Sequence, residues 1–502
     1  MRKLVALLLV LSLMLSLAST AFAAKDYTLD IYWIGNKDDE EIRKGVEEAV
    51  SEYVEPLIKA KVAFHLVTWD PEWTNVAIKA LMDDEKIDLI FTADWEGYVQ
   101  EILAGKLLPL DQDDLLEKNG EGILETLPQD FMDGAKFNGI LYGIPTNKEL
   151  CVPSGLIVNK TAAEKIGWDV EKDPVKTTEE LEPWLAKYKE MFPDNYPYLM
   201  EKDRWSDEPW IHEWVAIEGD ALDMKMAKNE DGEFDETVYS IYETEEQEAH
   251  IRLMRKWMEA GYINPEAADL GFDYNKEFGT GNFLVFTQPL KGNNIKSVEM
   301  YGANKAPDVP DFELTEIIMQ DKYLVTCQAG GSMFAIPKTA KYKTAMKYLN
   351  LMHSDPTLVN LMLYGKEGVN YRKVNDQQVE LIEDANWYGM HGGAWTVGNT
   401  KLQYVLTTED PEKNALLQSF ADGAPKTASY GFRLDKSKCQ DLLDSVAEVV
   451  KKFERPLMVG AVDPDDPEAG LEAFRKALKE AGIDDLKAEV EAQYATWKES
   501  LK

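Results

Sequence analysis

Tryptophan stands close to a short polar residue at three places in the N-terminal part of the chain. The three pairs are Trp33 with Asn36, Trp69 with Asp70, and Trp95 with Asp94. A sugar presents flat C–H faces and a ring of hydroxyls. Its binding therefore needs aromatic rings for the faces and planar polar groups for the hydroxyls. Residues of these types are therefore candidates for stacking on a ligand of that kind and for hydrogen bonding to it.

Further candidates of the same types fall in loops or at a polar break between two strands. They are the aromatic residues Trp205, Trp210, Trp387 and Trp395, and the polar residues Asn147, Lys148, Glu149 and Asn399. For each tryptophan the alternative is a packing role in a core. For each polar residue the alternative is helix capping or turn formation. His391, in a glycine-rich loop, is interpreted as a surface histidine.

Motifs for catalysis, metal binding or cofactor binding are missing from the sequence. It has no H-E-x-x-H, no G-x-S-x-G and no phosphate-binding glycine loop. Carboxylates are numerous, so a glycosidase acid/base pair stays open, but nothing singles out two of them. The turn from Asn229 to Glu233 favours a hairpin turn over a calcium loop. We expect a binding protein without a cofactor, not an enzyme.

Strand and helix patterns alternate before and after the three tryptophan pairs. The strands are expected at Leu29 to Trp33, Val62 to Trp69 and Ile87 to Thr92, and the helices at Glu40 to Leu57, Trp73 to Met82 and Tyr98 to Ala104. Such alternation is typical of a parallel sheet covered by helices. Ligands bind beyond the carboxyl ends of the strands in these sheets, which is where the tryptophan pairs stand.

A polar break between two short strands occupies the stretch from Gly139 to Lys160. Apolar residues at 140–142 and 155–158 predict the strands, and a helix is expected at 161–166. Later in the chain, helices are expected at 178–191, 244–260 and 342–352 and a loop at 389–399. Apolar spacings of three and four predict C-terminal helices at 442–453 and 486–497, with another helix starting at Asp466.

Length and composition indicate a globular protein of two or three domains. The chain has 502 residues, of which 45% are hydrophobic. Arg2-Lys3, an apolar run and Ala21-Phe22-Ala23 predict a signal peptide over residues 1–23. The formal charge of −37 disfavours nucleic-acid binding. The three cysteines, Cys151, Cys327 and Cys439, permit one disulfide or three reduced thiols.

Blocks in a fixed order over more than four hundred residues resemble a known family. They are Asp88 to Thr92 followed by Ala104 to Leu110, Lys136 to Pro145 followed by Leu156 to Lys160, Trp395 to Asn399, Tyr430-Gly431-Phe432, and Ala461 to Trp497. The chain resembles the extracellular solute-binding proteins of carbohydrate ABC importers, in particular a lipoprotein-type subgroup with a C-terminal domain of unknown function. It departs from many relatives because no lipobox cysteine follows the signal peptide.

The resemblance implies an α/β fold of the periplasmic-binding-protein type II. Two α/β lobes would be joined by a hinge, with the ligand cleft between them and helices at the C-terminus. We expect lobe 1 at residues 24–148 and about 328–372, lobe 2 at 149–327 and about 373–430, and a C-terminal helical region at 431–502. The segment from Gly139 to Lys160 would be the first hinge strand, with Asn147 to Glu149 on the floor of the cleft.

The resemblance also implies a function. The protein would be an exported monomer, periplasmic or at the cell surface, that binds an oligosaccharide and delivers it to ABC-transporter permease subunits. A secreted carbohydrate-active enzyme and a receptor for a peptide or another small solute are the alternatives.

Overall fold

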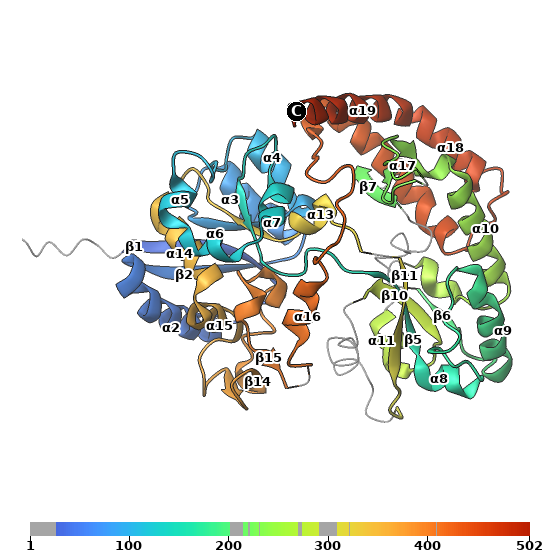
Figure 1. Ribbon diagram of the computed structural model, residues 1–502, viewed down its shortest axis with the longest axis horizontal. Helices are drawn as coiled ribbons and strands as arrows, with labels where there is room; N and C mark the ends of the chain where they lie inside the picture. The colour runs from blue at the N-terminus through green and yellow to red at the C-terminus, as the bar shows by residue number, and fades with distance from the viewer. Residues whose placement is uncertain are drawn as a thin grey trace, which may run out of the picture.

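The chain folds into two α/β lobes, with helices of the C-terminal region next to the second lobe (Figure 1). The computed structural model describes residues 27–200, 214–218, 221–229, 231–269, 274–290, 309–320, 322–407 and 409–501. The predicted signal peptide, Trp205 and Trp210 lie outside these residues. The predicted two-lobed α/β architecture with C-terminal helices is confirmed.

The first lobe contains a five-stranded sheet in the order β2-β1-β3-β12-β4. Its strands are β1 (Tyr27–Gly35), β2 (Ala60–Thr68), β3 (Leu89–Thr92), β4 (Gly143–Pro145) and β12 (Met333–Ala335). β1 is parallel to both β2 and β3, as the alternating pattern predicted. β12 comes late in the chain, yet it lies between β3 and β4 and runs antiparallel to both.

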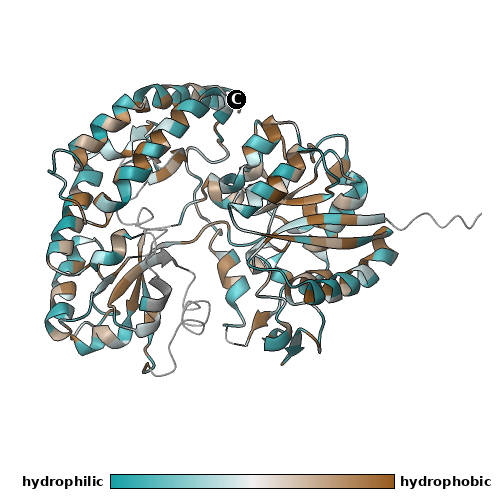
Figure 2. Cartoon of the chain, turned by 180° about the vertical axis from the view of Figure 1, so that it is seen from behind, coloured by the Kyte–Doolittle hydropathy of each residue, from teal (hydrophilic) through white to brown (hydrophobic). Residues whose placement is uncertain are grey.

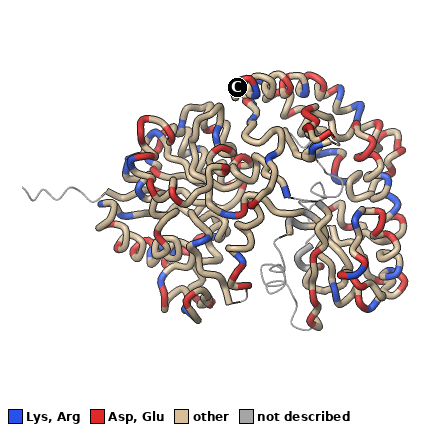
Figure 3. Tube along the Cα trace, viewed as in Figure 1, with Lys and Arg blue, Asp and Glu red and all other residues tan. Residues whose placement is uncertain are grey.

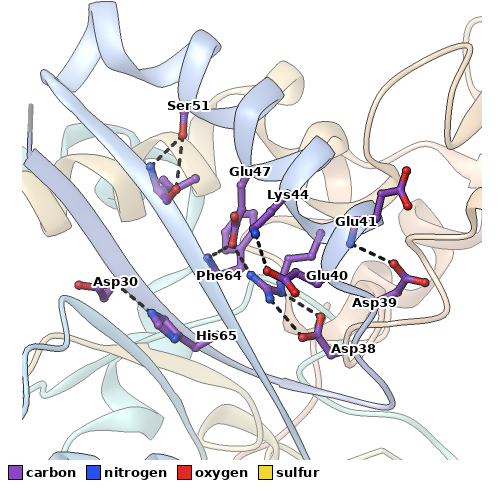
Figure 4. Close-up of polar contacts among 12 residues, drawn as sticks. Asp30, Asp38, Asp39, Glu40, Glu41, Lys44, Glu47, Ser51, Phe64 and His65 are labelled. Atoms are coloured by element: carbon purple, nitrogen blue, oxygen red, sulfur yellow. Dashed lines mark hydrogen bonds and ion pairs between the residues drawn. The ribbon is translucent and has the colours of Figure 1, made fainter.

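Helix α2 (Glu40–Ile58) begins at a carboxylate cap and lies along the edge strand β2 (Figure 4). The Asp39 carboxylate accepts hydrogen bonds from the N–H groups of Glu41 and Ile42, at 3.1 and 3.2 Å. A cap of this kind stabilises a helix by about 1 kcal/mol. Farther along the helix, the Glu47 carboxylate accepts a bond from the Phe64 N–H at 2.7 Å. This bond fixes α2 to the sheet and satisfies a donor on the edge strand.

Most other helices of the first lobe are short. They are α3 (Lys79–Met82), α4 (Tyr98–Leu103), α5 (Leu115–Asn119), α6 (Glu121–Thr126), α7 (Gln129–Ala135), α13 (Thr326–Ala329), α14 (Tyr342–Ser354), α15 (Pro356–Tyr364) and α16 (Lys413–Ser419). A small sheet of β13 (Tyr371–Lys373), β14 (Gln378–Leu381) and β15 (Val405–Leu406) completes the lobe. A π-helical segment, η1 (Trp73–Ile78), precedes α3 where one continuous helix was expected.

The segment around residues 373–430 packs in the first lobe, not in the second lobe as the family resemblance implied. Val379, Trp387, Met390 and Val397 are buried in the same core as the strands β1 and β3. Phe420 and Tyr430 pack against that core too. The reason is tertiary, because Trp387 bridges α15 and the sheet: its N–H donates to the Met362 carbonyl and its ring contacts Trp33.

The second lobe is built around a four-stranded sheet in the order β11-β5-β10-β6. Its elements are β5 (Ser154–Asn159), β6 (Tyr198–Leu199), β10 (Val285–Pro289) and β11 (Leu314–Gln320), with the helices α8 (Lys160–Lys165), α9 (Glu182–Met191) and α11 (Tyr274–Thr280). The Asn159 side chain caps α8 by accepting a bond from the Ala162 N–H at 3.0 Å. This places α8 directly after β5, close to where the sequence predicted it.

The C-terminal region forms a third hydrophobic core together with residues from the middle of the chain. It comprises β7 (Trp214–Glu218), β8 (Leu222–Lys225), β9 (Tyr239–Ser240), α10 (Glu245–Glu259), α17 (Gln440–Met458), α18 (Leu471–Glu480) and α19 (Ile483–Ser500). α10 joins two cores, because Ile251 is buried in this one while Met254 and Trp257 are buried in the second lobe. The predicted helix start at Asp466 is wrong. Its carboxylate instead holds a turn by accepting from the N–H groups of Glu468 and Ala469.

Three stretches of chain run between the first lobe and the rest of the molecule, and we call them the crossing segments (Figure 1). They are residues 146–153, 322–325 and 425–432. The second and third run side by side, since the Leu324 N–H donates to the Pro425 carbonyl at 2.9 Å and the Thr427 N–H donates to the Leu324 carbonyl at 3.1 Å. The first passes close by, with the Cys151 thiol 3.2 Å from the Phe420 carbonyl.

The surface carries both signs of charge, and its helices are amphipathic. Acidic and basic residues are interspersed along the C-terminal helices (Figure 3). Peripheral helices show hydrophilic and hydrophobic stretches side by side (Figure 2). Among the described residues, no helix combines the length and apolar character needed to cross a membrane. Cys151 and Cys439 are buried and Cys327 is exposed, and none of the three forms a disulfide.

Candidate functional site

The carboxyl ends of β1, β2 and β3 meet at one edge of the first-lobe sheet. Their parallel pairing places Gly35 opposite Thr68 and Tyr32 opposite Ile90. The next residues along the chain are Asn36 after β1 and Trp69 after β2, and Trp95 follows β3 within a few residues. Parallel strands therefore bring together side chains that stand far apart in the sequence.

Trp69, Trp95 and Trp395 form a ring cluster at this edge, which we call the tryptophan cluster. The ring centroids of Trp69 and Trp95 are 6.0 Å apart, and Trp395 lies 6.2 Å from Trp69 and 6.3 Å from Trp95. Phe91 of β3 supports Trp95 and Trp395 from the core, with centroids 6.0 and 5.9 Å away. Two of the three predicted strand-end tryptophans and the loop residue Trp395 thus meet in one place.

The rings of the cluster keep apolar surface in contact with solvent. Trp95 is 51% exposed and Trp69 is 36% exposed. Both indole N–H groups are already bonded. The Trp69 N–H donates to Asn36 Oδ1 at 2.9 Å, and the Trp95 N–H donates to the Gly331 carbonyl at 2.8 Å. Because the polar atoms are satisfied, the ring faces are what the cluster offers to a ligand. Such faces suit the C–H surface of a sugar ring.

Asn36 orients the cluster. Besides accepting the bond from Trp69, its amide nitrogen donates to the His391 carbonyl at 3.1 Å. The backbone N–H of Asn36 donates to the Met390 carbonyl at 2.7 Å. Asn36 therefore links the end of β1 to the loop that carries Trp395.

Acidic side chains stand beside two of the tryptophans. Burial, and secondly the negative charge of Asp70, raise the pKa of the Glu96 carboxyl to about 7. The Asp70 carboxylate accepts bonds from the N–H and the hydroxyl of Thr74, at 3.0 and 2.7 Å. Asp70 thus bonds to Thr74 in the first turn of η1 and is also an exposed acceptor next to Trp69 in the sequence.

Glu101 of α4 is a carboxyl buried near Glu96. Burial raises the pKa of Glu101 to about 8, against the lowering effect of the nearby Thr92 hydroxyl, and the charge of Glu96 adds a smaller increase. No hydrogen bond of ordinary geometry reaches either Glu101 oxygen. A neutral carboxylic acid at physiological pH fits this environment, because an unpaired buried charge is costly.

Asp94 is engaged by Arg433. The guanidinium donates from Nε to Asp94 Oδ1 at 2.6 Å and from Nη2 to Oδ2 at 2.8 Å, a bidentate pair in which both side chains are largely buried. Arg433 Nη1 also donates to the Lys136 carbonyl at 2.9 Å. The predicted polar candidate is therefore bound to a residue that sequence reasoning did not single out.

Of the polar candidates of the first crossing segment, Asn147 and Lys148 are buried and Glu149 is half-buried. The Asn147 amide donates to the Thr126 carbonyl at 2.9 Å, and its backbone pairs with the segment around Asn399. The Asn399 amide donates to the His353 carbonyl at 3.0 Å. The Lys148 ammonium lies 3.8 Å from a carboxylate oxygen of Glu149. Asn147 and Asn399 fasten the crossing segment to the first lobe.

Trp33 and Trp387 are core residues, not stacking candidates. Both are fully buried, and their rings contact each other with centroids 6.2 Å apart. The Trp33 N–H donates to the Thr396 hydroxyl at 3.0 Å, and that of Trp387 donates to the Met362 carbonyl at 2.6 Å. Trp33 lies inside β1, where its side chain faces the core, whereas Trp69 and Trp95 lie beyond their strands.

His391 is buried too, contrary to the predicted surface position. Its ring stacks on Trp33 with centroids 4.5 Å apart. Nε2 donates to the Leu363 carbonyl at 2.8 Å, and Nδ1 accepts from the Gly393 N–H at 3.0 Å. This pattern assigns a neutral imidazole, and burial lowers its pKa to about 4.

Sequence reasoning missed Phe91, Glu96, Gly331 and Arg433. Phe91 and Glu96 flank the predicted Asp94-Trp95 pair, so a wider window around β3 would have included them. Arg433 stands 339 residues from Asp94, and no local pattern connects the two. Its only signal is that it follows the block Tyr430-Gly431-Phe432.

Within the part of the chain that the structure describes, no metal centre accompanies the tryptophan cluster. In the described ranges, no group of three or more His, Cys, Asp or Glu residues is placed to hold a metal ion. The turn at Asn229 closes as a hairpin turn, with the Gly232 N–H donating to the Asn229 carbonyl at 2.9 Å and Lys228 paired with Phe234.

A cavity of about 570 Å³ lies between α16 and the segment 401–405, and one of about 390 Å³ lies beside Trp168. Neither is lined by the cluster.

Two family models and one related protein match the chain. Residues 77–386 match the model of the bacterial extracellular solute-binding protein family, and residues 428–499 match a domain of unknown function. A carbohydrate ABC transporter substrate-binding protein of Streptococcus pneumoniae is 25% identical over 477 residues, covering 93% of this chain and 90% of the relative.

Solved structures share the fold over nearly the whole chain. The N-glycan transport solute-binding protein NgtS of Streptococcus pneumoniae superposes with a TM-score of 0.77 at 20% identity, covering 95% of this chain and all of the other. An HMO-binding, ABC-transporter-associated solute-binding protein of Bifidobacterium longum infantis has a TM-score of 0.62 at 16% identity over 94% of this chain and 99% of its own. The family match spans more than half of the sequence. The chain belongs to the bacterial extracellular solute-binding protein family.

Proposed function

We propose that this protein is the ligand-binding receptor of an ABC importer and that its ligand is an oligosaccharide. The tryptophan cluster is the observation that carries the proposal. Three indoles with centroids 6.0 to 6.3 Å apart form an apolar surface at the carboxyl edge of a parallel sheet. Ligands of open α/β folds bind at such an edge. In support, NgtS has been crystallised with Man1GlcNAc and with Man5GlcNAc.

The proposed binding mode combines stacking with charge-assisted hydrogen bonds. Sugar rings stack on Trp69, Trp95 and Trp395, and the exposed Asp70 carboxylate accepts bonds from hydroxyls. Closure of the second lobe then brings further contacts to the other side of the ligand. Since a ligand that contacts both lobes binds the closed form better, it shifts the molecule towards closure.

Export and delivery complete the proposal. Residues 1–23 are the signal peptide, the mature chain is a monomer, and its closed form presents a joint surface of both lobes to permease subunits. The membership in an extracellular family supports export. The bond between sugar and protein is noncovalent throughout, in keeping with a receptor that releases its ligand unchanged.

A thermal-shift screen of the mature protein tests this function. The panel contains the glycans Man1GlcNAc, Man5GlcNAc, kestose and maltose, an alginate oligosaccharide and a set of mixed peptides. A ligand that binds only the folded state raises the melting temperature, and at a hundredfold excess over Kd the gain is about 2.7 kcal/mol. We expect at least one glycan to raise the melting temperature and no peptide to do so.

Two results would contradict the proposal. A melting-temperature increase with peptides alone assigns the protein to peptide transport. Release of reducing ends from a glycan during prolonged incubation, abolished by Asp70→Asn or Glu96→Gln, identifies a secreted carbohydrate-active enzyme. Mass spectrometry of the recovered glycan separates binding from turnover, because a receptor returns it intact.

A further inference from the structure

The residue Arg433 has an unusual position between two cores. Its neighbours Phe432 and Leu434 are buried in the core of the C-terminal region. Arg433 itself reaches the first lobe, where it forms the bidentate pair with Asp94. Only 5% of its side chain is exposed. One residue of the C-terminal region thus places a buried cation beside the tryptophan cluster.

Asp94 transmits this contact to Trp95, the most exposed ring of the cluster. The Asp94 N–H donates to the Gly330 carbonyl at 2.8 Å, and the Trp95 indole donates to the carbonyl of Gly331 at 2.8 Å. Gly330 makes room for the ion pair, because a Cβ there would lie 2.0 Å from Asp94 Oδ2. Arg433, Asp94, the two glycines and Trp95 therefore pack as one unit.

This unit lies where the crossing segments meet. Gly330 and Gly331 follow the second crossing segment, and Arg433 follows the third. The Thr326 hydroxyl joins the two by donating to the Ser429 carbonyl at 2.9 Å and accepting from the Gly431 N–H at 2.8 Å. Any rotation of the lobes about the crossing segments acts on residues adjacent to Arg433.

The C-terminal region is anchored to the second lobe at two places. The Arg455 guanidinium donates to the Ala267 carbonyl at 2.6 Å and to the Asp269 carbonyl at 3.2 Å. Gly460 packs on the backbone of Met254 so closely that a Cβ would lie 2.3 Å from the Met254 carbonyl oxygen. The Arg433–Asp94 pair is consequently a buried polar link between this anchored region and the edge of the first lobe that carries the tryptophan cluster.

We propose that Arg433 is a positioning residue that holds Asp94 and Trp95 in place from the C-terminal region, so that the geometry of the tryptophan cluster depends on where that region sits. The effect on ligand affinity rests on the proposed function, whereas the effect on cluster geometry does not. Arg433 acts through Asp94 and touches no ligand itself.

The first test needs no ligand. Near-ultraviolet circular dichroism and acrylamide quenching of tryptophan emission are measured for wild type, Arg433→Met and Arg433→Lys, with Arg475→Met as the matched control. Arg475 is a partly buried arginine of the same region that pairs with Glu248, remote from the cluster. We expect Arg433→Met to lose the circular-dichroism signal of the coupled indoles and to gain quenching. We expect Arg433→Lys to recover part of the signal and the control to match wild type. A wild-type spectrum for a folded Arg433→Met overturns the proposal.

A double variant separates positioning from simple charge balance. Asp94→Asn with Arg433→Met removes both buried charges, so it should recover stability relative to Arg433→Met alone. We expect its cluster spectrum and its affinity for Man5GlcNAc to stay impaired, with Kd raised about tenfold over wild type. Recovery of both stability and spectrum would reduce Arg433 to a counter-ion and overturn the proposal. If wild type binds no glycan of the panel, the proposed function fails, while the ligand-free spectra still decide the role of Arg433.

Discussion

Two tryptophans of the same lobe, Trp33 and Trp95, show how one residue type serves two purposes. Trp33 lies within β1 and is fully buried, stacked on His391. Trp95 lies beyond the end of β3 and is half exposed, although its indole N–H is bonded. A side chain inside a covered strand has no access to solvent, whereas one beyond the strand end does. The position relative to the strand end decides the role.

Replacement of cluster tryptophans should weaken glycan binding without unfolding the protein. Trp95→Ala removes a half-exposed ring, and we expect Kd to rise by about tenfold, since one stacking contact contributes roughly 0.5–1.5 kcal/mol beyond its buried area. Isothermal titration with the best glycan of the panel measures it. Trp184→Phe is the control, because Trp184 stacks on Trp168 in the second lobe. Equal losses in both variants would count against the cluster as the binding surface.

The buried Glu101 should make stability fall as pH rises. Its pKa is about 8 in the folded protein, above the ordinary value of 4.5, so the folded state holds a proton that the unfolded state has lost between these values. Unfolding free energy therefore decreases from about pH 4.5 to pH 8 by an amount on the order of a few kcal/mol. Glu101→Gln should remove this loss. Urea unfolding of both proteins at pH 5 and pH 8.5 measures this difference. If the unfolding free energy changes equally with pH in the variant and in wild type, the prediction is wrong.

His391 should make the stability of the protein decrease as pH falls, at lower pH than the range in which Glu101 acts. Its folded pKa of about 4 lies below the ordinary value of 6.5, so protons bind the unfolded chain first as pH falls through this range. Stability contributed by the neutral ring is present above pH 6.5 and is lost towards pH 4. We expect the wild-type melting temperature to drop over this interval and His391→Gln to drop less. The buried His353, whose pKa is about 3, adds to the slope in both proteins.

At the level of elements, local patterns predicted what local forces determine. β1, β2 and α2 were found within two residues of their expected ends, because apolar periodicity and the Asp39 cap are encoded nearby. The helix expected to begin at Asp466 begins only at Leu471, as α18. The Asp466 carboxylate instead accepts a hydrogen bond within a turn. Likewise, Trp69 and Trp95 were predictable as strand-end residues, whereas the ion pair of Asp94 with Arg433 depends on a contact across the fold.

Gly330, in the turn between α13 and β12, and Gly45, in α2, should respond in opposite ways to replacement by alanine. Gly330→Ala would place a Cβ 2.0 Å from Asp94 Oδ2 and 2.4 Å from Arg433 Nη2. We expect a loss of about 1–3 kcal/mol in unfolding free energy from this overpacking. Gly45→Ala is the control, since nothing lies within 4 Å of its Cβ in the exposed part of α2. Alanine should stabilise that helix by about 0.5–1 kcal/mol. Urea midpoints measure both, and an unaffected Gly330→Ala would exclude tight packing at the pair.

At the scale of the whole molecule, the cores do not follow the order of the chain. Segments around residues 214–251 and 432–497 share one core, and residues 324–397 share another with residues 29–151. Apolar patterns alone could not predict these partnerships, because they indicate which residues are buried but not which neighbours those residues meet. The assignment of residues 373–430 to the second lobe failed for this reason.

Removal of the C-terminal region should therefore damage the middle of the protein. Without residues 433–502, the buried side chains of Leu222, Met224 and Ile251 lose their partners in α17 to α19. We expect such a chain to bind a hydrophobic dye and to unfold without a cooperative transition. A chain shortened only by residues 501–502 should behave as wild type in the same thermal scan. A sharp transition in the long truncation would mean that residues 1–432 fold without the C-terminal region.

The central place of β12 has a consequence for how the protein acquires its structure. The strand at residues 333–335 inserts between β3 and β4, whose residues were synthesised far earlier. The first-lobe sheet is thus incomplete until the polypeptide for the second lobe has been made. Folding must wait for a large loop to close, and such non-local pairing is slow. The same topology that joins the two lobes therefore sets a delay in the folding of the first.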